Sequence, residues 1–513
     1  MTWQSNVDEL AQRQLHAREM GGAEKISRHR AAGKQTVRER IDGLLDAGSF
    51  REIGSITGNA HYGPDGIYAG TAASNFLFGR GKIQGRPVAV AADDFTVRGG
   101  ASDGASMDKI VASEQMAYEL RLPLIRLIDG SGGSIRTLEK LGRTYVPANP
   151  AWDWVALNLT TVPVVSLVLG SVAGFASARA VASHYSLMVR GTSHMFIAGP
   201  PVVARTGQTF TKDELGSADL HAKAGAIDDV VDSEQEALAC AARFLSYLPS
   251  SVDDLPPICP SSDPTDRREE RLISIVPTDR RKVYKMREIL SDVLDKESFF
   301  EWGRHYGRSA ITGLARLEGR TVAVLASDPY IYGGAWTAET AQKIIRFVDL
   351  AETFHLPVVH FVDIPGFLIG IDAERAATIR HGTRALSAIY QATVPWCSVI
   401  VRKAFGVAGA AHSNASRFRF RYAWPSGDWG SIPPEGGVEA AYRSEIAAAE
   451  DPDEMIREIT ARLEAIRSPF RTAEAFGVEE IIDPRQTRTF LCEFSQLAYR
   501  LIKPQPSRVQ YRP

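Results

Sequence analysis

The sequence predicts two α/β domains that are copies of one another. Three observations indicate this: a small-residue stretch that follows a buried strand occurs twice, matched positions recur at a constant spacing, and predicted strands alternate with predicted helices. Alternating strands and helices are typical of layered α/β folds. The chain has 513 residues and is 44% apolar, enough for more than one hydrophobic core.

The most informative stretch covers residues 393–412. A buried strand at Ser398–Val401 leads into a run of small residues, and a new helix is predicted to start at about Val407. The same pattern occurs 232 residues earlier in the chain (161 to 393). The matching segments are Thr161-Val162-Pro163 with Thr393-Val394-Pro395, and Gly174-Phe175-Ala176 with Gly406-Val407-Ala408.

Further matches share a spacing of 234 residues (85 to 319). They are Gly85 with Gly319, Gly99-Gly100-Ala101 with Gly333-Gly334-Ala335, Lys109 with Lys343, Pro123 with Pro357, and Asp129 with Asp363. So many matches at a constant spacing indicate an internal duplication, which then governs how each segment is interpreted.

Within the first copy, the elements are predicted in this order. A charged helix covers about Asn6–Leu45, and its basic face is expected to be solvated or, alternatively, to lie near a ligand's phosphates. A hairpin at residues 78–90 turns at Gln84-Gly85, and a helix follows at Ser106–Leu120. A strand at Leu122–Ile128 ends in the small-residue turn 129–134. The basic residues of the first helix are Lys25, Arg28, Arg30, Lys34, Arg38 and Arg40.

A Pro- and Ser-rich segment at residues 255–264 separates the two copies. We therefore expect an N-terminal domain at 1–257 and a C-terminal domain at 258–513.

The small-residue turns suggest a chemistry. The first N–H groups of a helix have no partner within the helix, so two of them can stabilise a negative oxygen that develops during a reaction. Two copies of such a turn suggest a reaction with two oxyanions. Asp363, which lies before Pro365, is interpreted as a turn-former, and Lys109 and Lys343 as helix-surface lysines.

Composition excludes several other classes. The net charge of −2 argues against nucleic acid as a partner. No run of eighteen apolar residues exists and the charged N-terminus has no signal-peptide core, so we expect a cytoplasmic protein without a membrane partner. Cys240, Cys259, Cys397 and Cys492 lack metal-binding spacing, and no metal is expected.

The chain resembles the carboxyltransferase (beta) subunits of biotin-dependent acyl-CoA carboxylases, of the propionyl-CoA carboxylase beta type, over nearly its whole length. The motifs that carry the resemblance are Asp94-Phe95-Thr96-Val97, Ser131-Gly132-Gly133, Met195–Pro200, Asp213–Gly216, Phe361–Leu368, Ile379–Gly382 and Arg402–Gly406. The resemblance implies a tandem crotonase-like (ClpP/crotonase) ββα superhelix of two duplicated domains, with acyl-CoA on the N-terminal side and biotin on the C-terminal side.

The resemblance also implies the roles of individual residues. The amides of Gly174 and Phe175 would hold the thioester oxygen, and those of Val407 and Ala408 the biotin ureido oxygen, during transfer of a carboxyl group from carboxybiotin. The acyl-CoA side would be lined by Gly132, Gly133, Ser134 and Ala173. The biotin side would be lined by Gly333, Gly334, Ala335, Asp363, Pro365, Gly366, Phe367 and Gly406.

The implied cofactor is biotin on a separate carrier protein, because the chain has neither a biotinyl-lysine motif nor a Gly-rich ATP-grasp signature. The implied partners are a biotin carboxylase and a biotin carboxyl carrier subunit, with a homo-oligomer that is at least a dimer and is expected to be a hexamer. No ATP is expected on this chain. A carboxyltransferase of a biotin-dependent decarboxylase remains an alternative, because the sequence barely separates it from a carboxylase. Phe175, Val407 and Ala410 depart from the family pattern, and Phe175 and Val407 best support the other alternative, a catalytically silent scaffold subunit.

Overall fold

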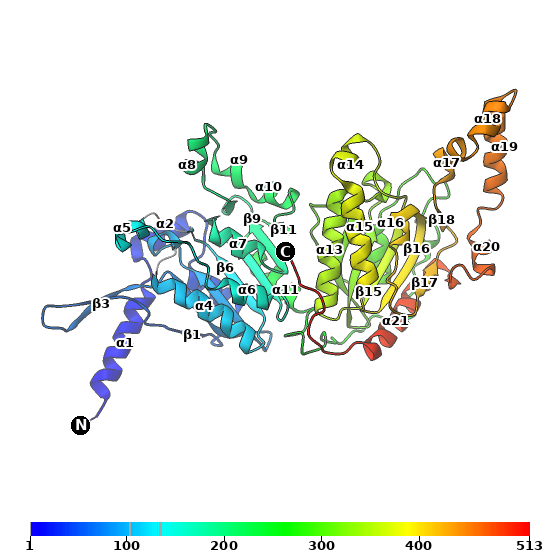
Figure 1. Cartoon of the computed structure of the whole chain (residues 1–513). Helices are drawn as coiled ribbons and strands as arrows, with labels where there is room; N and C mark the ends of the chain where they lie inside the picture. Colours follow the sequence, from blue (N-terminus) through cyan, green and yellow to red (C-terminus); the bar gives the residue numbers. More distant parts are fainter. Residues whose placement is uncertain (1, 102–103, 131, 133–135) are drawn as a thin grey trace. The chain divides into compact units, whose positions relative to one another are not determined.

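The computed structural model describes residues 2–101, 104–130, 132 and 136–513. The chain divides into two compact units, Met1–Asp254 with Gln505–Pro513, and Leu255–Pro504. The division therefore lies close to the expected boundary at 257/258, but the C-terminal residues 505–513 pack with the first unit (Figure 1).

The first unit is built on a seven-stranded sheet of order β1-β4-β5-β6-β7-β9-β11. β1, β4 and β5 are antiparallel, and each later pair is parallel, as expected for a hairpin followed by strand–helix–strand connections. The strands are β1 (Arg51–Ile53), β4 (Phe76–Ile83), β5 (Arg86–Asp93), β6 (Leu124–Ile128), β7 (Val164–Val168), β9 (Tyr185–Val189) and β11 (Asp229–Val231). Two small sheets pair β2 (Gly58–Tyr62) with β3 (Tyr68–Ala73), and β8 (Ser171–Ala173) with β10 (His194–Phe196).

Helices of the first unit bury the apolar sides of these strands. Ile110 and Ala117 of α4 pack with Phe76, Ala89 and Leu124 in one hydrophobic cluster. The helices are α1 (Gln4–Arg18), α2 (Ala23–Ala31), α3 (Val37–Leu44), α4 (Gly104–Glu119), α5 (Arg136–Leu141), α6 (Trp152–Asn158), α7 (Phe175–Val181), α8 (Pro200–Val203), α9 (Lys212–Gly216), α10 (Ala218–Lys223) and α11 (Glu234–Leu245), with 3₁₀ turns at Arg98–Gly100 and Ala204–Thr206.

The long N-terminal helix predicted at about Asn6–Leu45 is wrong as a single element, because the structure has three helices there. Gly22 and Gly33 adopt positive φ of 89° and 78°: Gly22 precedes the start of α2 and Gly33 follows its end, so neither position continues a helix. Gly21 also packs so closely that an added Cβ would lie 2.1 Å from the carbonyl oxygen of Thr96.

The second unit repeats this plan with an eight-stranded sheet of order β12-β13-β14-β15-β16-β17-β19, in which β18 also pairs with β16. Again an antiparallel start is followed by parallel strands. The strands are β12 (Phe300–Trp302), β13 (Ala310–Leu317), β14 (Arg320–Ser327), β15 (Val358–Ile364), β16 (Trp396–Phe405), β17 (Phe420–Ala423), β18 (Asp428–Gly430) and β19 (Glu480–Ile481).

Alternate residues of these strands form one large core cluster with α12 and α21. Ile311, Val324 and Phe361 of the sheet belong to it together with Ile289 and Leu491 of the two helices. The helices of this unit are α12 (Met286–Val293), α13 (Ala338–Thr353), α14 (Ile371–Arg375), α15 (Thr378–Gln391), α16 (Gly406–Ala410), α17 (Pro434–Ala441), α18 (Arg443–Ala448), α19 (Pro452–Glu464), α20 (Pro469–Glu474) and α21 (Thr487–Leu501), with 3₁₀ turns at Glu270–Ile273, Tyr332–Gly334 and Pro484–Gln486.

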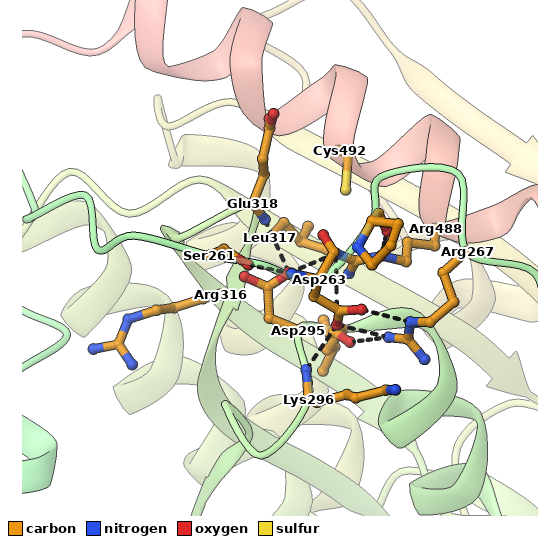
Figure 2. Close-up of polar contacts among 12 residues, drawn as sticks. Ser261, Asp263, Arg267, Asp295, Lys296, Arg316, Leu317, Glu318, Arg488 and Cys492 are labelled. Carbon is orange, nitrogen blue, oxygen red and sulfur yellow. Dashed lines mark hydrogen bonds and ion pairs between the residues drawn. The ribbon is translucent and has the colours of Figure 1, made fainter.

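The duplication is visible in how each unit ties its first hairpin. In the first unit, the Asp46 carboxylate accepts the N–H groups of Gln84 and Gly85 at 2.9 and 2.7 Å. In the second unit, Asp295 accepts those of Glu318 and Gly319 at 3.0 and 2.8 Å (Figure 2). The two turns therefore use the same device.

Asp295 also joins the segment between the copies to this hairpin. Figure 2 shows Arg488 of α21 beside Asp295 and Asp263; its Nη2 donates to Asp295 at 2.8 Å, and its Nε donates to the carbonyl oxygen of Pro264 at 2.7 Å. Burial acts to raise the pKa of Asp295, but the hydrogen bonds from Gly319, Arg488 and Glu318 outweigh it and hold that pKa below its usual value.

Candidate active site

The first small-residue turn follows β8 and is formed by Gly174. Gly174 has φ 58° and ψ −119°, a backbone conformation that glycine adopts readily and other residues do not. α7 begins directly after it, at Phe175. The amides of Phe175 and Ala176 have no acceptor among the described residues. The Gly174 N–H donates to the carbonyl oxygen of Phe196 at 3.3 Å, so it is not available as predicted.

This turn lies against the segment that follows β6. A Cβ added to Gly132 would lie 2.7 Å from the carbonyl oxygen of Ala173 and 3.6 Å from the nitrogen of Phe175. The fold thus brings Gly132, Ala173 and the turn together, although they are distant in the sequence. Gly133 and Ser134, which were also predicted to line the acyl-CoA side, lie outside the described residues.

The second turn follows β16 and repeats the first. Gly406 has a φ of 62°, and the amides of Val407 and Ala408 have no acceptor among the residues that the structure describes. An apolar cavity of about 500 Å³ lies beside α16. Its lining includes Ile400, Val407, Ala410, His412, Arg421, Trp429 and Val478.

The residues predicted for the biotin side meet at the ends of β14, β15 and β16. A Cβ on Gly334 would lie 2.3 Å from the carbonyl oxygen of Asp363. The N–H of Trp336 donates to the carbonyl oxygen of Gly366 at 3.1 Å, and the rings of Trp336 and Phe367 lie 6.3 Å apart. Gly333 and Ala335 flank Gly334, and Pro365 precedes Gly366, so the segments after β14 and β15 lie against one another.

Asp363 does not fit the role of a ligand-contacting residue. Its side chain is 0% exposed, and its carboxylate accepts hydrogen bonds from Tyr284, Arg402 and the backbone of Lys403. A buried carboxylate with this many donors is already satisfied. The prediction that it contacts biotin is therefore wrong for its side chain, and its interpretation as an ordinary turn-former is incomplete.

In the first unit, a buried charge cluster that the sequence reasoning missed lies behind the site. Asp129 follows β6 and pairs with Arg40 at 3.0 Å and with Lys34 at 3.3 Å. Arg40 also pairs with Glu234 at 2.6 Å and is 1% exposed. Part of the predicted basic face therefore points inward. Arg40 and Lys34 attach α3 and the segment before it to Asp129, which follows β6.

Asp93, at the end of β5, belongs to the same region. Its carboxylate accepts the N–H of Asp129 at 3.2 Å. Burial raises the pKa of Asp93 to about 6, although Arg179 acts in the opposite direction. Ser327 holds the N–H of Asp363 in the same way in the second unit, at 3.1 Å. The internal duplication was the signal that could have identified this pair.

The two matched lysines are not surface residues, so that prediction is wrong. Lys109 is 6% exposed and donates to the carbonyl oxygen of Gly54 at 3.2 Å. Lys343 is 5% exposed and donates to that of Ala310 at 2.7 Å. Burial lowers the pKa of Lys109 to about 8. Both lysines fasten a helix to the backbone, which periodicity alone does not reveal.

Two further observations concern the described part of the chain. There, no group of three or more His, Cys, Asp or Glu side chains is arranged to hold a metal ion. None of the helices that the structure describes combines the length and the apolar character needed to cross a bilayer.

Comparison with known proteins agrees with this geometry. Residues 28–510 match the model of the carboxyl transferase domain family. The chain is 35% identical to the propionyl-CoA carboxylase carboxyltransferase subunit of Haloferax mediterranei, over 99% of both chains. It is 33% identical to the methylmalonyl-CoA carboxyltransferase 12S subunit of Propionibacterium freudenreichii subsp. shermanii, over 95% of this chain and 93% of that one.

The fold comparison gives the same result. The solved transcarboxylase 12S hexamer, with methylmalonyl-coenzyme A and methylmalonic acid bound, has a TM-score of 0.88 and 31% identity, covering 99% of this chain and 98% of that chain. The predicted tandem crotonase-like fold is thereby confirmed. The relatives named here are all carboxyl-transferring enzymes, so neither the decarboxylase nor the scaffold alternative is favoured. The chain therefore belongs to the carboxyl transferase family, as a carboxyltransferase subunit of the acyl-CoA carboxylase type.

Proposed function

We propose that this subunit transfers a carboxyl group from biotin, held on a separate carrier protein, to the α or vinylogous carbon of an acyl-CoA thioester. The observation that carries the proposal is the repeated turn: Gly174 and Gly406 have φ of 58° and 62°, and each precedes two amides without an acceptor in the described structure. Two such turns suit a reaction in which negative charge develops on two oxygens.

The first turn would hold the thioester oxygen. Forming a carbon–carbon bond at the α carbon requires an enolate, whose charge resides largely on that oxygen. The amides of Phe175 and Ala176 are the pair proposed to stabilise it, because the Gly174 N–H already bonds to Phe196. The 232-residue spacing (175 to 407) supports this choice, because Phe175 and Ala176 of the first copy correspond in sequence to Val407 and Ala408 of the second.

The second turn is suited to the ureido oxygen of biotin. When bound, biotin supplies the carboxyl group. The Val407 and Ala408 amides offer two donors, and the side chains of Val407 and Ala410 give the cavity beside α16 an apolar wall next to them, while Arg421 also lines the cavity. This chain's contribution there would be to bind and orient the oxygen.

The aspartates nearest the two sites are poorly placed for proton transfer. Asp129 and Asp363 are each 0% exposed, and both carboxylates are occupied by cationic or N–H partners. Stabilisation of charge by backbone donors, rather than general base catalysis by these carboxylates, is therefore the proposed role of this chain.

The chain would work in an assembly. A biotin carboxylase and a biotin carrier must load the carboxyl group, and we propose a hexamer like that of the transcarboxylase 12S structure. We expect the purified chain, given ATP, bicarbonate and acyl-CoA alone, to carboxylate nothing. With the partner co-purified, labelled bicarbonate should enter one or more members of an acyl-CoA panel that includes acetyl-, propionyl-, butyryl- and 3-methylcrotonyl-CoA. No turnover with a demonstrably loaded carrier would contradict the proposal.

The turns can be tested by removing one N–H at a time. Proline is tolerated in the first turn of a helix, so Phe175→Pro and Val407→Pro remove a donor with little distortion. Each should lower kcat by about 10²- to 10³-fold, as expected for the loss of one oxyanion donor. Phe175→Ala and Val407→Ala are the matched controls, since they change the same side chains and keep the N–H. Equal activity of a proline variant and its alanine control would refute the role of that turn.

A further inference from the structure

The strand that leads into the second turn contains an irregularity. β15 and β16 pair in parallel, with Val362 opposite Ile400 but Ile364 opposite Ala404. Two residues of β15 therefore span four of β16, so β16 bulges at residues 401–403. In the first unit, β6 and β7 pair without a shift from Leu124 opposite Val164 to Ile128 opposite Val168. That pairing ends at Ile128 and Val168, which match Val362 and Ile400 at the spacings of 234 and 232 residues (128 to 362, 168 to 400), so the segment that corresponds to the bulge is not paired between β6 and β7.

The Asp363 carboxylate holds this bulge. Oδ1 accepts the backbone N–H of Lys403 at 3.0 Å, and Oδ2 accepts Arg402 Nη2 at 3.0 Å and Tyr284 Oη at 2.9 Å. Arg402 is itself 3% exposed and donates through Nη1 to the carbonyl oxygen of Lys282 at 2.7 Å. A strand neighbour would normally accept the Lys403 N–H, and here a side chain replaces it.

The same segment also supports the second turn, at Gly406. Gly409 of α16 packs on the backbone of Ala404 so closely that a Cβ there would lie 2.5 Å from the Ala404 carbonyl carbon. Lys403 and Ala404 therefore lie between the Asp363 carboxylate and α16. A shift of the bulge would move the turn at Gly406 and the two amides that follow it.

We propose that Asp363 is a positioning residue for the second turn: by holding the bulge at residues 401–403, it sets the direction of the Val407 and Ala408 N–H groups. This inference rests on the proposed role of those amides. Ionic and backbone hydrogen bonds to one buried carboxylate have a defined geometry, so they fix the turn more closely than apolar packing would.

The test uses the holoenzyme with its partner subunit and an accepted acyl-CoA. In the double variant Asp363→Ala/Arg402→Met, the carboxylate and its buried cation are removed together, so no unpaired charge remains. We expect kcat to fall at least tenfold while KM for acyl-CoA changes less than threefold, since the thioester would lie on the first unit. Tyr284→Phe is the control, because it removes one donor to Asp363 and leaves the bond to Lys403; its kcat should stay within threefold.

A comparison with Val407→Pro separates positioning from general loss of structure. If Asp363 acts through the turn, adding Val407→Pro to the double variant should lower kcat by much less than it does in the unmodified enzyme. A full multiplicative loss, or an unchanged kcat in the double variant, would overturn the inference. If Val407→Pro alone has no effect, it is the proposed function of the turn that fails.

If the double variant does not assemble, Asp363→Asn serves in its place. Asparagine keeps an acceptor for Lys403 but loses the charge that holds Arg402, so we expect a smaller fall in kcat. Adding Val407→Pro to Asp363→Asn should again lower kcat by less than it does in the unmodified enzyme. An Asp363→Asn enzyme whose melting temperature falls while its kcat is unchanged would overturn the inference.

Discussion

At the scale of single residues, the candidate site is supported by buried charges that carry a cost. Asp93 is the clearest case, because burial raises its pKa to about 6 from an ordinary 3.8. When the pKa of a carboxyl group is higher in the folded than in the unfolded protein, ionisation of that group lowers the free energy of unfolding. Its unfavourable contribution is absent below the unfolded pKa, grows as the pH rises from about 4, and is complete above about 6.

Asp93→Asn should therefore stabilise the first unit increasingly as the pH rises. Asparagine keeps the acceptor for the Asp129 N–H and cannot ionise. The difference in unfolding free energy between variant and parent should grow by about 2 kcal/mol between pH 4.5 and pH 8. Urea titrations at several pH values measure it, and a difference that does not vary with pH would refute the assignment.

At the scale of elements, the two hairpin turns offer a matched pair of glycines. Gly85 and Gly319 have φ of 80° and 75°, and each donates its N–H to an aspartate carboxylate. A Cβ on Gly85 would meet nothing within 4 Å, whereas one on Gly319 would lie 1.7 Å from the carbonyl oxygen of Cys259. The hairpin turn of the second unit is thus covered by the segment between the copies, near the residues drawn in Figure 2.

We expect Gly85→Ala to cost about 1–2 kcal/mol of unfolding free energy, the cost of a left-handed conformation for alanine. Gly319→Ala should cost clearly more, because the backbone around Cys259 must also move. Urea unfolding of the two variants, followed unit by unit, makes the comparison. Equal losses would show that the contact with Cys259 is easily relieved.

Sequence patterns predicted β6 and α16 well, because the apolar runs and small residues that define such elements are close together in the chain. The strand at Leu122–Ile128 was found as β6, and the helix expected from about Val407 begins at Gly406. Local patterns could not show which of the N-terminal arginines are buried, because the partners of Arg40 are Asp129 and Glu234, distant in the chain. For the same reason Asp363 was predicted to line the biotin side, although its side chain pairs with Tyr284 and Arg402.

At the scale of the whole molecule, the chain returns to its first unit after completing the second. Residues 505–513 belong to the first unit by their contacts, and the N–H of Gln505 donates to the carbonyl oxygen of Val252 at 3.2 Å. Tyr511 is 4% exposed, and its ring lies 4.5 Å from that of His184. His184 in turn accepts the N–H of Val164 at the start of β7.

Tyr511→Ala should therefore destabilise the first unit, although the residue follows the second unit in the sequence. Losing a buried aromatic side chain costs about 3–5 kcal/mol in a well-packed core, and a site at a chain end should lie at the low end of that range. The transition of the first unit should shift to lower urea concentration while that of the second unit stays in place. Arg512→Ala, at an exposed neighbour, is the matched control and should change neither transition. A shift confined to the second unit's transition would show that this segment stabilises residues 255–504 instead.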